Sequence, residues 1–149
     1  MRKKITGVIV LLLVMIPGIT VCAGTRATVS YTVDPAYTVT IPKDTRLKYG
    51  EEITSYGKIT VNEAQIDEDK CIRVTMDTDG RLKNQNDGKS ELPYEILADG
   101  APFTSADYTE VGQETPLDIV ITKENWKKAK AGAYTSNVTF VISYADKAE

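Results

Sequence analysis

Short runs in which apolar and polar side chains alternate residue by residue constrain this chain more than any other feature of its sequence. Successive side chains of a β-strand point to opposite faces, so each run predicts a strand with one buried face and one face in water. We predict seven such strands, at residues 27–33, 37–41, 59–61, 72–76, 92–96, 117–121 and 134–144. Pro93 has no N–H to donate to a neighbour, which places the fifth strand at the edge of a sheet.

Turn residues separate these runs, and glycine supplies the positive φ that tight hairpins require. Turns are predicted at Asp79-Gly80, Asp87-Gly88 and Asp99-Gly100. About seven short strands with regular turns predict an all-β fold, an immunoglobulin-like antiparallel β-sandwich. One short helix is expected before the last strand, over Thr122–Ala131, with Thr122 as its N-cap and Gly132 at its end.

The first residues have the composition of a secretory leader. Three basic residues at positions 2–4 precede an apolar run from 5 to 21, which ends in the segment Val21-Cys22-Ala23. This order of segments predicts a signal peptide over residues 1–23, with cleavage after Ala23, and a single β-sandwich domain over residues 24–149. We therefore expect the protein to be extracellular, either secreted or held non-covalently at the cell surface.

Three alternatives to this cleavage stay open. Cleavage after Gly24 is nearly as compatible with the pattern, and the apolar run is long enough for an uncleaved leader to anchor the chain in a membrane. Cys22 stands where bacterial lipoproteins carry a lipid, although Val21 before it is larger than such sites prefer. Cleavage after Ala23 would remove Cys22 and leave Cys71 as the remaining cysteine, so no intramolecular disulfide is expected.

Charge and composition disfavour several classes of function. The chain has 21 acidic and 18 basic side chains, and loss of the basic leader makes the mature protein more acidic, which argues against nucleic acid as a partner. Histidine, the commonest general base and metal ligand, is absent from the sequence. We therefore expect a protein that is not an enzyme, with no catalytic residues, no cofactor and no metal.

The polar stretch at residues 77–91 offers the side-chain oxygens that calcium prefers. These oxygens belong to Asp77, Asp79, Asn84, Asn86 and Asp87. The spacing does not fit the calcium loop of an EF-hand, because Gly80 comes too early and Arg81 occupies the fifth position. A solvated hairpin with two Asp-Gly turns is the favoured interpretation.

Two aromatic residues are candidates for special roles. Trp126 shares a face of the predicted helix with Ala129, so we expect it to plug one end of the sandwich. The alternative is a ligand-binding role, in which the Trp126 ring is a platform for a sugar. Tyr134 follows the small residues 131–133 and has the position of the structural corner tyrosine that ties a loop to its strand in immunoglobulin-like domains.

The first and last predicted strands bear on assembly. We expect the last strand, residues 134–144, to be a central strand that closes the sandwich. The first, residues 27–33, is the strand that could exchange between copies. Cys71 alternates out of phase with Ile72 and Val74, so it is predicted to face away from the core, where it could cross-link two copies.

Four parts of the chain carry a resemblance to a known group of proteins: "YTVTIP" at 37–42, "PLDIVIT" at 116–122, Trp126, and "AGAYTSNVTFVISY" at 131–144. They resemble segments of small secreted β-sandwich surface proteins of Gram-positive, Firmicute-type bacteria, among them pilin-like and adhesin-like modules. The resemblance implies an extracellular or cell-surface role and brings no catalytic residues. The last residues contain no sortase-type Leu-Pro motif, so covalent attachment to the cell wall is not expected.

These observations predict a secreted or cell-surface protein with a structural or adhesive, non-catalytic role. Its partners would be proteins or glycans at the cell surface, with self-assembly through the N-terminal strand as a further option and membrane contact only through an uncleaved leader. A soluble carbohydrate-binding module is the alternative function, with Trp126 and exposed tyrosines lining a groove. A small hydrolase is disfavoured by the absence of histidine.

Overall fold

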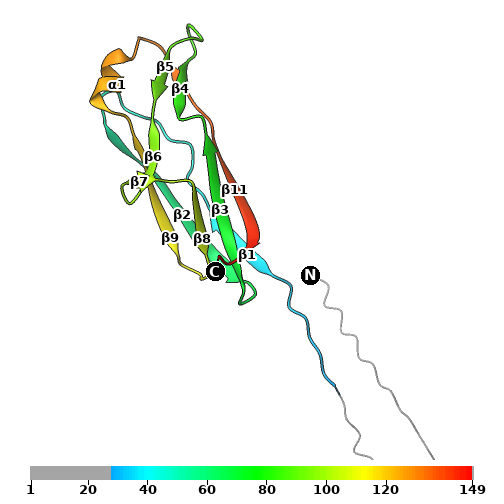
Figure 1. The fold of residues 1–149 in the computed structure, drawn as a ribbon. Helices are drawn as coiled ribbons and strands as arrows, with labels where there is room; N and C mark the ends of the chain where they lie inside the picture. The colour runs from blue at the N-terminus through cyan, green and yellow to red at the C-terminus, as the bar shows by residue number, and fades with distance from the viewer. Residues whose placement is uncertain (1–27, 149) are drawn as a thin grey trace, which may run out of the picture. The chain divides into compact units, whose positions relative to one another are not determined.

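The computed structural model describes residues 28–148. By its contacts the chain divides into Met1–Asp34 and Pro35–Glu149, and every strand and helix of the described residues belongs to the second unit. That unit is an antiparallel all-β sandwich with one short helix before its last strands, as the sequence predicts (Figure 1). The predicted signal peptide, with Cys22 and both cleavage positions, lies outside the described residues. In residues 28–148 no helix is long and apolar enough to cross a membrane.

The first layer is a five-stranded sheet with the order β1-β2-β9-β6-β7. Its strands are β1 (Ala36–Thr40), β2 (Ile53–Gln65), β6 (Glu95–Ala98), β7 (Ala101–Pro102) and β9 (Glu114–Val120). The long strand β2 pairs with β1 along residues 60–65 and with β9 along residues 53–60. One strand of thirteen residues therefore joins two shorter strands into one layer.

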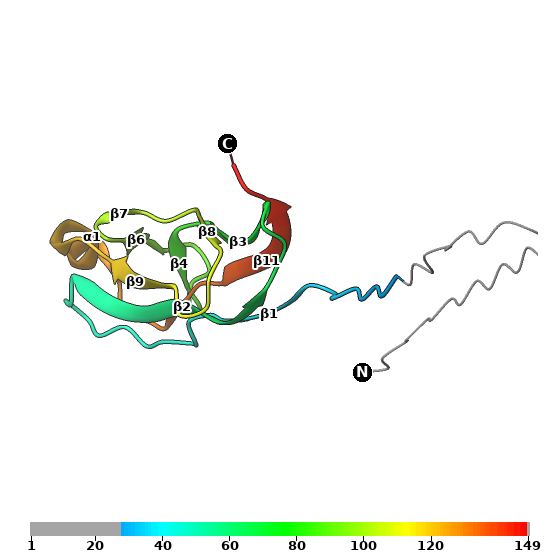
Figure 2. The ribbon, with the colours of Figure 1, turned by 90° about the horizontal axis from the view of Figure 1, so that it is seen from below.

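The second layer consists of two three-stranded sheets, with the orders β11-β3-β8 and β10-β4-β5. Their strands are β3 (Lys70–Thr78), β4 (Arg81–Asn84), β5 (Glu91–Pro93), β8 (Ser105–Tyr108), β10 (Tyr134–Thr135) and β11 (Val138–Asp146). β3 leads directly into β4, and β10 leads directly into β11. Each of these two stretches of chain therefore passes from one of the sheets into the other. Seen from below, β6, β7 and β9 lie on one side and β3 and β11 on the other (Figure 2).

The apolar faces of the two layers meet in one core. The most deeply buried members alternate along their strands as predicted, and they are Ile59, Val61, Ile72, Val74, Leu92, Leu117 and Ile121. Ile121 directly follows β9, and the others come from strands of both layers, so each layer removes the apolar face of the other from water. The two-residue alternation therefore located the strands that face each other across the sandwich.

The helix α1 (Lys123–Lys128) lies between β9 and β10, where the sequence predicts it. Thr122 is its N-cap, because the Thr122 hydroxyl oxygen accepts a hydrogen bond of 3.2 Å from the N–H of Asn125. The helix is shorter than predicted: Ala129 already has extended backbone angles, with φ −65° and ψ 125°. Gly132 therefore lies beyond the helix end and does not form it.

The described residues form eleven strands rather than about seven. The strand predicted at 92–96 breaks at Tyr94 into β5 and β6, which belong to different layers, and β5 lies at a sheet edge as Pro93 requires. The strand predicted at 134–144 breaks at residues 136–137. The pattern missed β4, β7 and β8, because runs of two to four residues are too short to show a clear alternation.

The strand predicted at residues 27–33 is wrong for the described part of that range. Residues 28–33 carry no strand pairing, and two of their apolar side chains, Val29 and Tyr31, are 96% and 76% exposed. A strand needs a neighbouring backbone to satisfy its N–H and C=O groups, and alternation alone does not supply one. The segment has the side-chain pattern of a strand without the partner.

The prediction of a central last strand is also wrong. Within residues 28–148, β11 pairs with β3 alone, and β3 pairs with β8 on its other side. In Figure 1, β11 lies beside β3 at the margin of the second layer. The last strand is therefore an edge strand.

The core predicts a clear contrast between two apolar positions. Leu117 is fully buried at the centre of β9, so Leu117→Ala is expected to lower the free energy of unfolding by about 2–5 kcal/mol. The matched control Val111→Ala removes an exposed side chain and is expected to change it by less than about 0.5 kcal/mol. Urea unfolding followed by tryptophan fluorescence measures both. Equal effects would contradict the core described here.

Candidate functional site

The outer edge of β11, meaning the side of that strand that faces away from β3, is the first candidate site. The N–H of Met76 on β3 donates a 2.8 Å hydrogen bond to the C=O of Thr104, towards β8. Backbone groups of consecutive strand residues point to opposite sides, so Met76 and every second residue from it bond towards β8. The intervening residues 71, 73, 75 and 77 bond to β11, opposite residues 145, 143, 141 and 139.

It follows that Phe140, Ile142 and Tyr144 direct their N–H and C=O groups to the outer edge of β11. The 3.0 Å hydrogen bond from the N–H of Lys147 to the C=O of Asp69 continues the same phase beyond the strand. In the part of the chain that the structure describes, these three outward-facing residues make no backbone hydrogen bond to another strand. The outer edge is therefore a row of backbone donors and acceptors available to an additional strand.

The side chains along this edge do little to block such an addition. Sheet edges are commonly protected by lysine, proline or bulges, and the run from Val138 to Ala145 contains neither lysine nor proline. Two neighbouring apolar side chains, Val141 and Ile142, are 53% and 36% exposed. They point to opposite faces of the strand, so both faces beside the edge present apolar surface.

Aromatic contacts hold β11 to the first layer. The Tyr144 ring stacks on that of Tyr37 from β1, with 6.0 Å between centroids, and the Phe140 ring lies 6.2 Å from that of Tyr56 on β2. The Tyr144 hydroxyl also donates to the carboxylate of Asp67 at 2.8 Å. These contacts fix the position of β11, so its outer edge is a surface of a well-packed strand.

A groove of about 1150 Å³ is the second candidate site. The irregular segment 44–49 lines one wall and residues 129–138 line the other. Its aromatic members are Tyr49, Tyr56, Tyr94, Trp126 and Tyr134. A groove that combines apolar walls, aromatic rings and a few polar groups is the usual character of a small-molecule site.

The placement of Trp126 favours the end plug over the ligand platform. Its side chain is 8% exposed and belongs to the core cluster, and its indole N–H donates to the C=O of Glu51 at 2.9 Å. A ring buried to this extent offers a ligand an edge rather than a face. Tyr49 lies against it edge to face, 5.4 Å between centroids, and is 78% exposed. Tyr49 is thus the accessible aromatic ring of the groove.

Sequence reasoning missed Tyr49 because it lies in the irregular segment between β1 and β2, where no alternation marks it. The only local signal is the Tyr49-Gly50 pair, since Gly50 has a positive φ of 80° and marks a turn.

Tyr134 lies where a structural corner residue would be placed. Its hydroxyl accepts a 3.0 Å hydrogen bond from the N–H of Lys130 and donates one of 3.1 Å to the C=O of the same residue. Gly132, between the two, packs against the buried Asn84, where a Cβ would come within 2.6 Å of the amide. The loop between α1 and β10 is therefore tied to its strand by one hydroxyl group and one close backbone approach.

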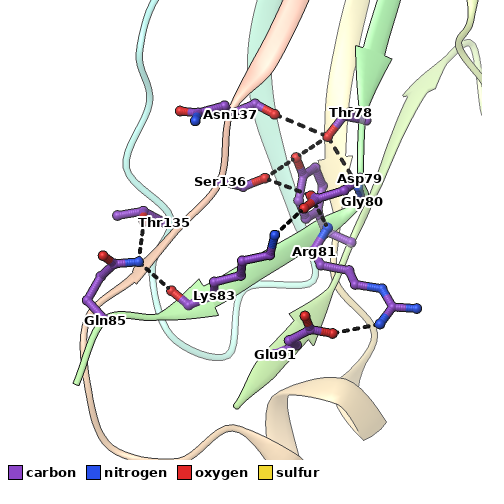
Figure 3. A network of polar contacts seen from close by, with 11 residues as sticks. Thr78, Asp79, Gly80, Arg81, Lys83, Gln85, Glu91, Thr135, Ser136 and Asn137 are labelled. Carbon is purple, nitrogen blue, oxygen red and sulfur yellow. Dashed lines mark hydrogen bonds and ion pairs between the residues drawn. The ribbon is translucent and has the colours of Figure 1, made fainter. Parts of the chain in front are cut away.

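A polar cluster fills the break between the two sheets of the second layer (Figure 3). The Asp79 carboxylate forms a 2.9 Å ion pair with Lys83 and accepts the N–H of Arg81 at 3.1 Å. Ser136 connects this carboxylate to the Tyr94 hydroxyl, through contacts of 3.4 Å and 2.8 Å. The hydrogen bond from Lys83 holds the pKa of Asp79 below its usual range.

The cluster lines a shallow hollow of about 440 Å³, in which the charged side chains of Asp79 and Lys83 pair with each other. Arg81 binds the Glu91 carboxylate at 2.6 Å, on the neighbouring strand β5. These contacts connect β3, β4, β5 and the start of β11 across the sheet break. We assign the cluster a structural role.

The five candidate calcium ligands do not converge. Asp87 accepts the N–H groups of Lys89 and Ser90 at 2.9 and 2.8 Å and the Ser90 hydroxyl at 2.6 Å. Asn84 is buried, and its amide oxygen accepts the N–H of Asn86 at 2.8 Å. In the described residues no group of three or more acidic, cysteine or histidine side chains could hold a metal. Gly80 and Gly88 both have positive φ, as the Asp-Gly turns of a solvated hairpin require.

Cys71 is placed differently from the prediction. It lies outside the central core cluster, as its phase predicts, but it is fully buried, and its thiol donates to the C=O of Asp146 at 3.6 Å. Burial raises the pKa of the Cys71 thiol, which lowers its reactivity. The prediction that Cys71 could cross-link two copies is therefore wrong for the folded protein.

The chain matches no protein-family model, and comparison with curated protein sequences gives no significant match. The assignment of a function therefore depends on the geometry of these surfaces.

The Asp87 turn predicts a dependence of stability on pH. Hydrogen bonds from Ser90 and Lys89 lower the pKa of Asp87 to about 2, against about 3.9 in an unfolded chain. A lowered folded-state pKa stabilises the fold above about pH 4, and this contribution is lost as pH falls towards 2. Asp87→Asn keeps an acceptor oxygen but not the charge, so its melting temperature should lie below that of the parent at pH 7 and converge with it near pH 2. A difference that persists unchanged at low pH would contradict this assignment.

Proposed function

We propose that this protein is a secreted or cell-surface module with a structural or adhesive, non-catalytic role, and that it acts by pairing its sheet edge with partners. The outer edge of β11 is the observation that carries the proposal. Phe140, Ile142 and Tyr144 direct backbone donors and acceptors outward on a strand that side-chain packing holds in place. Addition of a strand to such an edge is a common mode of recognition between proteins.

The other polar features support a non-catalytic role. The strongest polar cluster neutralises its own charges through the Asp79–Lys83 and Arg81–Glu91 pairs. A nucleophile or general base needs a polar group that is positioned but unsatisfied, and with a shifted pKa suited to its task. The sequence has no histidine to act as that base. Hydrogen bonding that ties strands together is the simpler purpose of these residues.

The extracellular location rests on the sequence of the first 23 residues. A basic segment, an apolar run and small residues in that order are typical of a leader that directs export. The resemblance to small Gram-positive surface proteins supports the same location and extends the proposed partners to proteins or glycans at the cell surface. Export also suits an unprotected edge strand, because inside the cell such an edge could pair with newly made chains and aggregate.

Assembly of the mature chain, residues 24–149, tests the proposal. We expect light scattering to show species larger than one chain that grow with protein concentration, and electron microscopy to show regular particles or fibres. The chain with Val111→Lys, which adds charge at an exposed position in the turn between β8 and β9, is the control for the effect of general changes in solubility on these measurements. A protein that stays monomeric at all concentrations, and that binds no cell-surface material, would overturn the proposal.

A soluble carbohydrate-binding module is the second candidate function, because the groove beside Trp126 exposes the ring of Tyr49. An exposed aromatic ring can cover the apolar face of a sugar, while the rim of the groove contains hydroxyl groups from Thr45, Thr135 and Ser136. The ring that would stack is then Tyr49 rather than Trp126.

Gel mobility in the presence of soluble polysaccharides tests this second function. Tyr49→Ala should weaken binding by about threefold to tenfold, the scale of one aromatic contact. The control Ile53→Ala removes a similarly exposed apolar side chain outside the groove and should leave binding unchanged. Equal mobility of the parent with and without every polysaccharide would exclude the module.

A further inference from the structure

We propose that residues 28–33 of one chain add as an extra strand to the outer edge of β11 in a second copy of this protein. The inference rests on the proposed function and specifies the partner of the same edge. It joins two observations: a segment that has the side-chain pattern of a strand without a neighbour, and a strand edge that has backbone groups without a neighbour.

The segment has the features of a donor strand. Val29, Tyr31 and Val33 alternate with Thr28, Ser30 and Thr32, and the three apolar side chains are 96%, 76% and 49% exposed. Large apolar side chains at that level of exposure gain free energy from any surface that covers them. An alternating pattern fits a site with one apolar and one wet face, which a sheet edge provides.

The outer edge of β11 matches the segment in length and in backbone phase. Six residues of extended chain span about 20 Å and the nine residues of β11 about 30 Å, so the segment fits within the edge. Phe140, Ile142 and Tyr144 each offer one N–H and one C=O, spaced two residues apart as an added strand requires.

The side chains match as well when the apolar face of the segment lies on the core side of the sheet. Val29, Tyr31 and Val33 would then extend the row formed by Phe140, Ile142 and Tyr144, next to the ring of Tyr37. The exposed part of Ile142 would be covered. Ser30 and Thr32 would lie on the outer face, beside Val141 and Ser143.

Pro35, directly before β1, favours addition to a second copy over addition to the same chain. Stacking of Tyr37 on Tyr144 shows that β1 starts at the end of the sandwich where β11 finishes. To run along its own β11 or β1, the segment would have to reverse direction immediately before Ala36. Two-residue hairpin turns need positive φ, which proline cannot adopt, since its ring holds φ near −65°.

Such an addition is a head-to-tail contact, because a donor segment on one copy meets a different surface on the next. Contacts of this kind repeat from copy to copy and give open filaments unless the rotation closes a ring, of which a reciprocal dimer is the smallest. Each copy of the protein in such an assembly would be both donor and acceptor.

Disulfide trapping between copies tests the inference on the mature chain, residues 24–149. In an added strand, Val141 lies between two outward-bonding residues, where opposed side chains of neighbouring strands come closest. One protein carries Val141→Cys and the other carries Ser30→Cys or Thr32→Cys. Mild oxidation of the mixture should give a cross-linked dimer from at least one donor position. The buried Cys71 is left in place.

Two controls separate strand addition from random contact. Tyr31→Cys replaces the donor thiol by one on the opposite face of the segment, and Val111→Cys replaces the acceptor thiol by one in the exposed turn between β8 and β9, so each should lose the dimer band. The inference would be overturned if Tyr31→Cys gave the dimer with Val141→Cys in the same yield as Ser30→Cys does. It would also be overturned if neither Ser30→Cys nor Thr32→Cys gave a dimer. Light scattering of the same samples without oxidation distinguishes the two proposals. Large species without specific trapping would remove this pairing and leave the proposed function, whereas monomers throughout that also bind no cell-surface material would remove both.

Discussion

Every strand in a sheet has two sides, and the backbone groups on each side need a partner. In this protein that requirement is met for β3, which lies between β11 and β8, and for β2, which bonds to β1 and β9. For β11 it is met on one side by β3, within the described residues. Both β1 and β11 are edge strands, one in each layer. Aromatic contacts between them, such as Tyr37 on Tyr144, hold the two edges next to each other.

The same requirement explains where the polar side chains gather. The second layer is not one continuous sheet, because the pairing with the last strands is interrupted at Asp79-Gly80, between β3 and β4, opposite residues 136–137. Backbone groups at this break would be left without partners, and side chains take their place: Thr78 accepts the N–H of Gly80 at 3.2 Å, and Asp79 accepts that of Arg81. The polar cluster around Asp79 has the composition of a binding site, but its side chains serve to satisfy backbone groups at the break in the sheet.

The alternation of apolar and polar residues predicted the strands whose burial depends on neighbouring residues in the sequence, and little else. Alternation located β1, β3 and β9, because a strand with one buried face has apolar side chains at every second residue. It mistook residues 28–33 for a paired strand, since it reports which faces are apolar and not whether a neighbour exists. The position of β11 in its sheet was wrong for a related reason: strand order depends on contacts between distant segments. Tyr49 was missed because an irregular segment has no period, and Cys71 because the covering residues come from other parts of the chain.

The two candidate surfaces are adjacent but do not compete. The groove reaches along residues 129–138, whereas the outward-facing backbone groups belong to residues 140, 142 and 144. A strand bound along that edge would leave Tyr49 exposed at the other end of the sandwich. An assembly built through β11 would thus repeat the groove once per copy, and repetition raises the effective concentration of a weak site without any new contact. The proposed structural role and the proposed glycan-binding role are consequently compatible in one chain, and an assembly that combined them would be adhesive.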